Sequence, residues 1–235
     1  MSLFSKKSDV APASRDYSTR EGALNYVLDG LEALDKSEPV AIDFISTPDV
    51  HQFCKTIGFK KSWAGRTLDD IAPKDEDAEV NVCIEEEGRI VLDLMKETIS
   101  QERFAAREKG EGYDLTILND FLPKGENEGE PTLGHLWEWR YALAVELEHG
   151  RTRGANVTNN HPLLTGLVVL AHLAEDKLYY ARLQCMEREG EIGNAMREGA
   201  SQKEIGRHAA LLERARLYLA RRVSEKLGEK VPTPA

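Results

Sequence analysis

The sequence predicts a mainly α-helical protein, in which a C-terminal antiparallel helical bundle follows a smaller N-terminal mixed α/β region. Three observations support this fold class. Apolar residues recur at helical spacing over most of the C-terminal half. Two of the expected helices open with a serine followed three residues later by a glutamate, which is the capping-box pattern. Two short apolar runs before residue 90 favour strands.

The N-terminal half contains short and varied elements. Residues 1–17 are rich in Ser, Lys, Asp, Ala and Pro, so we expect an extended arm there. Residues 18–121 are expected to form a mixed helical and α+β region. Its elements are a helix opened by Ser18 and Glu21, a strand over 40–45, a helix over 48–57 with Gly58 just past its end, a strand over 80–84, and a helix from Ile90 that fades near Lys109.

The C-terminal half is organised around longer helices. Residues 122–131 (LPKGENEGEP) combine Pro, Gly and acidic residues without apolar periodicity, so we predict a linker. Residues 132–228 then form a bundle domain of three helices, and residues 229–235 form a tail. The three helices are expected over 133–149, over 162–189 with Asn160 or His161 as the cap before Pro162, and onward from the capping pair Ser201 and Glu204.

Composition restricts the function classes. The formal net charge is −10, and acidic residues outnumber basic ones 19 to 7 between residues 67 and 131, so nucleic acid is an unlikely partner. Three widely spaced cysteines argue against a disulfide framework and for a reducing compartment. The longest apolar run, residues 167–173, is far shorter than the roughly 20 residues that a membrane helix needs. We therefore expect a protein without a membrane partner.

Four ionisable residues are the candidate site. Glu146 and His149 are three residues apart, as are His172 and Glu175, so each pair shares one side of its helix. If the helices are antiparallel neighbours, the pairs can meet and offer imidazole and carboxylate ligands to zinc or iron. The order His172–Glu175 is reversed relative to the Glu-x-x-His of di-iron bundles. We therefore favour a polar clasp, in which a histidine on one helix hydrogen-bonds a glutamate on its partner, and assign no metal ligand.

Other features indicate structure more than chemistry. Arg207, Arg214 and Arg221 recur every seven residues along the last helix and are joined by Arg222, so one helix face could contact an acidic partner or phosphates, although a solvated face is the favoured interpretation. The three tryptophans are expected to be core or interface anchors. No phosphate-loop, dinucleotide, nucleophile-elbow or zinc-protease motif occurs, so we assign no catalytic or cofactor-binding residue and no cofactor.

Three segments resemble a known family. ELEHG (146–150), NVTNNHPLLTG (156–166) and LAHLAED (170–176) look like a small helical domain of unknown function that occurs in tailed-phage and bacterial proteins. That family usually has an acidic residue where this chain has His161, which argues against a cation-holding role for the loop. The resemblance implies no chemistry, and its frequent setting suggests a virion or phage accessory protein.

The expected function is therefore a non-enzymatic structural or interaction protein, in particular a tailed-phage virion component such as a capsid or decoration subunit. Its partners would be other protein subunits in a homo-oligomer or capsid lattice. It would be found in the virion after assembly in the host cytoplasm, or otherwise in the cytoplasm. The alternative is a metal-binding helical bundle that uses the cluster of Glu146, His149, His172 and Glu175.

Overall fold

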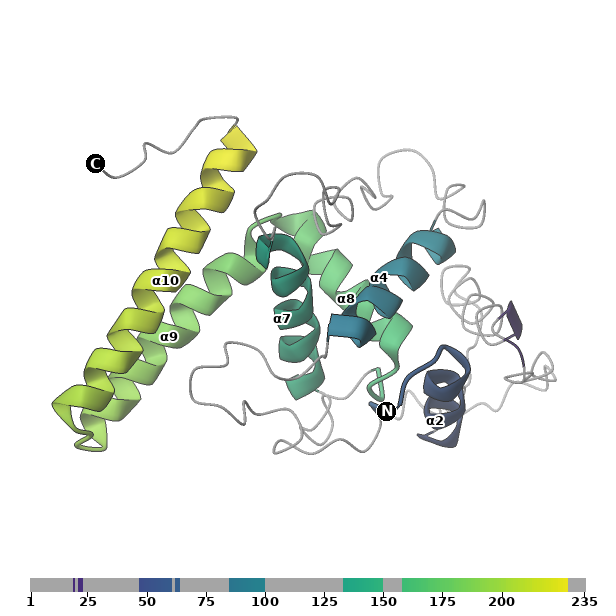
Figure 1. Ribbon diagram of the computed structural model, residues 1–235, viewed down its shortest axis with the longest axis horizontal. Helices are drawn as coiled ribbons and strands as arrows, with labels where there is room; N and C mark the ends of the chain where they lie inside the picture. Colours follow the sequence, from purple (N-terminus) through teal and green to yellow (C-terminus); the bar gives the residue numbers. More distant parts are fainter. Residues whose placement is uncertain are drawn as a thin grey trace, which may run out of the picture.

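The computed structural model describes residues 19, 21–22, 47–60, 62–63, 85–99, 133–149 and 158–227 (Figure 1). Within these residues it contains six helices and no strand, so the prediction of a mainly helical protein is confirmed. The predicted arm, strands, linker and tail lie outside the described residues. The helices are α2 (Thr47–Thr56), α4 (Glu85–Ile99), α7 (Leu133–His149), α8 (Pro162–Glu175), α9 (Tyr179–Arg197) and α10 (Gln202–Leu227).

Helix α2 agrees with the helix predicted over 48–57 to within one residue at each end. Gly58 has φ +97, and its N–H donates to the Lys55 carbonyl at 3.2 Å, while the Phe59 N–H donates to the Cys54 carbonyl at 2.8 Å. This pair of bonds is the Schellman arrangement, which needs a left-handed residue that glycine supplies without strain. Of the helix predicted from Ser18, only residues 19 and 21–22 are described; there the Gly22 N–H donates to Thr19 Oγ1 at 3.0 Å, so a capping bond is made one residue after the predicted Ser18.

Helix α4 begins earlier than its apolar periodicity indicated. It starts at Glu85 rather than Ile90, so the acidic run Glu85–Glu87 forms its first turn. Negative charge near a helix N-terminus interacts favourably with the exposed N–H groups there. The periodicity was therefore a poor guide to this boundary, because polar first-turn residues carry no apolar signal.

The hydrophobic core lies where α4, α7 and α8 pack together, and α2 contributes Val50, Phe53 and Cys54 to it. Trp63 and Trp139 are fully buried, as the sequence predicted. The Trp63 indole N–H donates to Glu87 Oε2 at 3.0 Å, and the Trp139 indole N–H donates to the Gly88 carbonyl at 3.1 Å. These bonds satisfy the polar end of each large side chain at the first turn of α4. The core thus includes residues that precede segment 122–131 in the sequence and residues that follow it.

The helix predicted over 162–189 is wrong as a single element. It is divided into α8 and α9, and Asp176 between them is extended, with φ −143 and ψ 114. Its Oδ1 accepts a hydrogen bond from the Leu178 N–H at 3.0 Å, and its carbonyl accepts one from the Tyr179 N–H at 2.8 Å. An aspartate that bonds the backbone two residues ahead competes with helix continuation. The break redirects the chain into α9.

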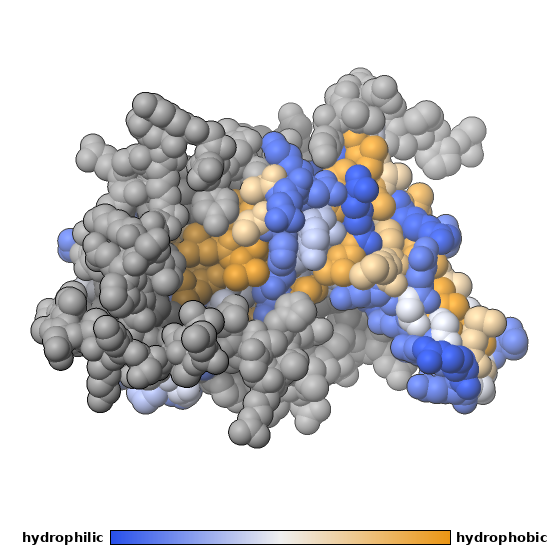
Figure 2. All heavy atoms as spheres, turned by 180° about the vertical axis from the view of Figure 1, so that it is seen from behind, coloured by the Kyte–Doolittle hydropathy of each residue, from blue (hydrophilic) through white to orange (hydrophobic). Residues whose placement is uncertain are grey.

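Helices α9 and α10 form a long hairpin that extends away from the other helices (Figure 1). Gly199, with φ +72, lies in the turn, and its N–H donates to the Met196 carbonyl at 3.3 Å. The predicted cap of α10 is confirmed, because Ser201 Oγ accepts from the Glu204 N–H at 3.2 Å. From behind, hydrophilic and hydrophobic residues alternate along the hairpin (Figure 2). None of the described helices is long and apolar enough to cross a membrane.

Helix α8 approaches α4 closely at Gly166. A Cβ placed there would lie 2.9 Å from Met95 Sδ and 3.2 Å from Val91 Cγ1. By contrast, a Cβ at the α10 residue Gly206 would meet nothing within 4 Å. The two helical glycines therefore differ in packing alone.

We predict opposite effects of alanine at these two glycines. Gly206→Ala should raise the free energy of unfolding by up to about 1 kcal/mol, because alanine favours the helix more than glycine. Gly166→Ala should forfeit this gain and lower the free energy of unfolding by roughly 1 kcal/mol or more, because Met95 must move. Urea unfolding of the full chain measures both values, and equal stabilisation by the two variants would contradict the close contact.

Candidate functional site

A buried polar cluster joins three helices. Glu146 on α7 is buried, and its Oε1 accepts a hydrogen bond from the Tyr180 hydroxyl at 2.8 Å. His172 Nδ1 lies 3.1 Å from the same carboxylate oxygen and 3.1 Å from the Tyr180 hydroxyl. The three residues come from α7, α8 and α9 respectively. We call Glu146, His172 and Tyr180 the clasp.

The aromatic residues around the clasp fix its geometry. The Tyr179 ring stacks on His172 with centroids 4.5 Å apart and an interplanar angle of 7°. Burial, reinforced by the Glu146 charge and hydrogen bond, raises the pKa of Tyr180 well above its usual range, so its hydroxyl remains a proton donor. The carboxylate is therefore held by a permanent donor on one helix and an imidazole on another.

The predicted candidates have different positions. Glu146 and His172 meet, which confirms the hydrogen bond between helices that the polar clasp required. Glu175 is the last residue of α8 and is exposed, and the side chain of His149 lies outside the described residues. Within the part of the chain that the structure describes, no three His, Cys, Asp or Glu residues are grouped to hold a metal. The described contacts suit a helix-joining role, because the Glu146 oxygen is already shared by two partners.

The third member of the clasp was missed in the sequence. Tyr180 follows the helix break at Asp176, and a continuous helix through residues 176–178 would have given it a different direction. The available signal was Asp176, because an aspartate side chain can accept from the backbone N–H two residues ahead, as it does here from Leu178. That pattern is common in loops and turns, but the helical periodicity on both sides obscured it.

A second buried acid joins α7 to α10. Glu138 Oε2 accepts from the Tyr218 hydroxyl at 2.6 Å and from Arg222 Nε at 2.9 Å. Arg222 is only 5% exposed, so the prediction that it extends the arginine face of the last helix is wrong. Its charge is neutralised by a buried carboxylate, whereas Arg214 and Arg221 are exposed. Helical spacing separates these cases, because Arg222 is outside the seven-residue series and lies about 100° around the helix from Arg221.

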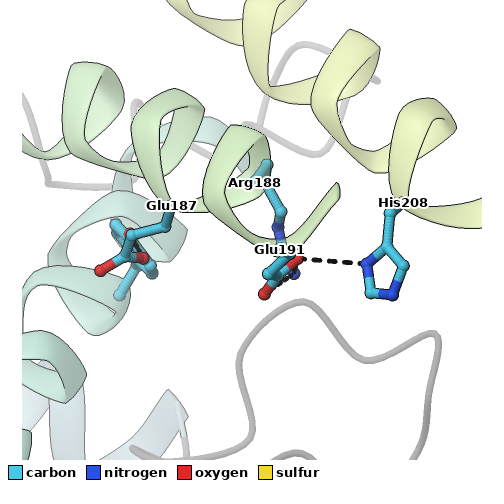
Figure 3. A network of polar contacts seen from close by, with 5 residues as sticks. Glu187, Arg188, Glu191 and His208 are labelled. Atoms are coloured by element: carbon cyan, nitrogen blue, oxygen red, sulfur yellow. Dashed lines mark hydrogen bonds and ion pairs between the residues drawn. The ribbon is translucent and has the colours of Figure 1, made fainter. Parts of the chain in front are cut away.

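A further polar network fastens α9 to its neighbours (Figure 3). Arg188 Nη1 donates to both oxygens of Glu191, at 3.0 and 2.9 Å, and His208 Nδ1 of α10 lies 3.3 Å from Glu191 Oε2. Glu187 accepts a short hydrogen bond from the Tyr141 hydroxyl of α7. These contacts mark the side of the hairpin that faces the core helices.

The turn before α8 contains buried polar atoms. Asn159 and Asn160 both have positive φ, 48 and 55, and Asn160 Nδ2 donates to the Trp63 carbonyl at 3.3 Å.

His161 is only 1% exposed, and its ring lies 4.1 Å from the Phe53 ring. Neither ring nitrogen of His161 has a hydrogen-bond partner among the residues that the structure describes. Burial lowers the pKa of His161 to about 3, so the ring is neutral. It occupies the N-cap position without a side-chain capping bond.

Residues 90–189 are similar to a family described as a protein of unknown function, DUF5661. The matched segment includes most of α4, all of α7 and α8, and α9 as far as Glu189, so it contains the whole clasp. The match confirms the resemblance to a domain of unknown function. No curated protein and no solved structure matches the chain.

We predict that the Tyr180 hydroxyl stabilises the fold. Tyr180→Phe should lower the free energy of unfolding by about 1 to 3 kcal/mol, because it removes a donor from a buried carboxylate. Tyr179→Phe is the matched control. The Tyr179 ring stacks on His172, but its hydroxyl makes no hydrogen bond in the described structure. Chemical unfolding at neutral pH measures both. Equal losses from the two variants would contradict the clasp.

We also predict that His161 makes stability pH-dependent. Its folded pKa of about 3 lies below the unfolded value of 6.5, so unfolding takes up a proton at intermediate pH and stability is lost as the pH falls below about 6.5. Between about pH 7.5 and pH 5 the unaltered chain should lose about 2 kcal/mol more than His161→Leu, which cannot titrate there. Urea titrations at both pH values test this, and parallel losses in the two proteins would refute it.

Proposed function

We propose that the chain is a non-enzymatic structural or interaction protein that assembles with other protein subunits through the α9–α10 hairpin. One observation carries the proposal. Among the described residues, the large apolar side chains that are exposed are Met186, Met196 and Leu217, at 62%, 64% and 69%, and all three lie on the hairpin. Apolar side chains gathered on one projecting element are typical of a protein–protein contact.

The buried acids support a non-enzymatic role. Glu87, Glu138 and Glu146 are the buried carboxylates of the described residues, and each accepts a hydrogen bond from a Trp, Tyr or Arg side chain. A general acid or base must reach a substrate proton. Carboxylates that are enclosed and occupied by protein donors are suited to holding helices together.

The setting that we propose is a tailed-phage virion, where the chain would serve as a capsid or decoration subunit assembled in the host cytoplasm. Support for this setting comes from the resemblance of the segments 146–150, 156–166 and 170–176. Repeated subunit contacts in such a particle would use exposed apolar surface of the kind that the hairpin carries.

The test is the mass of the assembly that contains the full chain in its native cells or particles. The chain should elute well above its own mass of 26.3 kDa, at a fixed ratio to its partners. Met186→Glu combined with Met196→Glu should lower the recovered assembly at least tenfold, because two buried charges oppose association. Elution of the unaltered chain at 26.3 kDa would contradict the proposal.

A further inference from the structure

One side of the hairpin forms a continuous exposed surface. Along α9, residues 186, 189, 193 and 196 recur every three or four positions, and along α10 residues 209, 213, 216 and 220 do the same, so each set shares one side of its helix. Arg216 Nη2 and Glu189 Oε1 join the two sets at 2.9 Å. We call this surface the outer face; its residues, all exposed, are Met186, Glu189, Gly193, Met196, Ala209, Glu213, Arg216 and Ala220.

The outer face points away from the core helices. Glu187, which contacts Tyr141 of α7, is two residues from Glu189 and therefore about 200° around α9. The pair Glu191 and His208 joins α9 to α10 (Figure 3), and Glu191 is two residues from Glu189 and therefore about 200° around α9 from it. Nothing in the described structure covers the outer face, although it has two exposed methionines and small residues that allow close approach.

Charge favours a second copy as the occupant. Arg216 is bonded to Glu189 and, at 2.9 Å, to Glu213, so the charges of the outer face form one internal network. A surface of this kind offers little attraction to a strongly acidic or basic partner. The exposed basic residue Arg214 is two positions from Arg216, so it lies about 200° around α10. Two outer faces can therefore meet without bringing together the arginine series (Arg207, Arg214 and Arg221) of the two copies.

The available area also fits a pair of copies. Helix α9 has 19 residues, which corresponds to a length of about 28 Å at about 1.5 Å per residue. Two helices side by side are about 20 Å wide, so mutual contact would bury on the order of 1,100 Å² in total. This area lies near the lower end of specific interfaces, where weak and transient pairs are found.

We propose that the outer face pairs with the outer face of a second copy, so that two hairpins form an intermolecular four-helix bundle. The contact is isologous, with each Met186 and Met196 seated against small residues of the partner's hairpin. Methionine suits this packing because its unbranched side chain adapts to irregular gaps. This inference rests on the proposed function and names its partner.

Sedimentation velocity of the purified full chain alone tests the pairing. Over about 1 to 100 µM the chain should shift from monomer to dimer, and added salt should not weaken the dimer, because apolar contact is not screened. Met186→Glu combined with Met196→Glu should raise the dissociation constant at least tenfold. Arg214→Glu is the matched control, since it changes the net charge by the same amount but lies about 200° around α10 from Arg216, and it should leave the dimer unchanged.

Three results would overturn the inference. The first is a chain that stays monomeric throughout the range, and the second is a dimer that the methionine variants leave intact. The third is a dimer that dissociates in high salt, which would indicate contact through charged residues. If the purified chain is monomeric but still elutes in a larger native assembly, the pairing fails while the proposed function stands. Circular dichroism of each variant confirms that the helices remain folded.

Discussion

The buried carboxylate of Glu146 is the interaction on which the arrangement of the helices depends. It accepts from Tyr180 at 2.8 Å and lies 3.1 Å from His172, so one oxygen joins α7, α8 and α9. A buried carboxylate without partners would be costly, and this cost makes the relative position of the three helices specific. Tyr180 reaches Glu146 because the chain breaks at Asp176.

The same principle recurs away from the clasp. Glu87 of α4 accepts a hydrogen bond from Trp63, and Glu138 of α7 accepts hydrogen bonds from Tyr218 and Arg222 of α10. Each acid joins elements that are far apart in the sequence. Buried acids therefore hold the helices in place, and the surface that remains for contact with other molecules is on the projecting hairpin.

Sequence patterns predicted what depends on local chemistry. The bounds of α7, the serine cap of α10 and the glycine that ends α2 follow from residues within one or two helical turns. The contact of Glu146 with His172 was also expected, as a hydrogen bond between a histidine on one helix and a glutamate on its partner. The rest depended on distant neighbours. His161 packs against Phe53, 108 positions away, and Arg222 is paired in the interior with Glu138, 84 positions away.

The central claim is that the clasp holds α7 and α8 within one chain, while the α9–α10 hairpin associates with a second copy. Amide hydrogen exchange of the full chain at low and high protein concentration tests this claim most directly. We expect the amides of α7 and α8 to exchange equally slowly at both concentrations, because the clasp is intramolecular. Amides of α9 and α10 along the outer face should exchange more slowly at high concentration, because pairing buries them. Concentration-independent exchange throughout the hairpin, or concentration-dependent protection of α7 and α8 alone, would contradict the account.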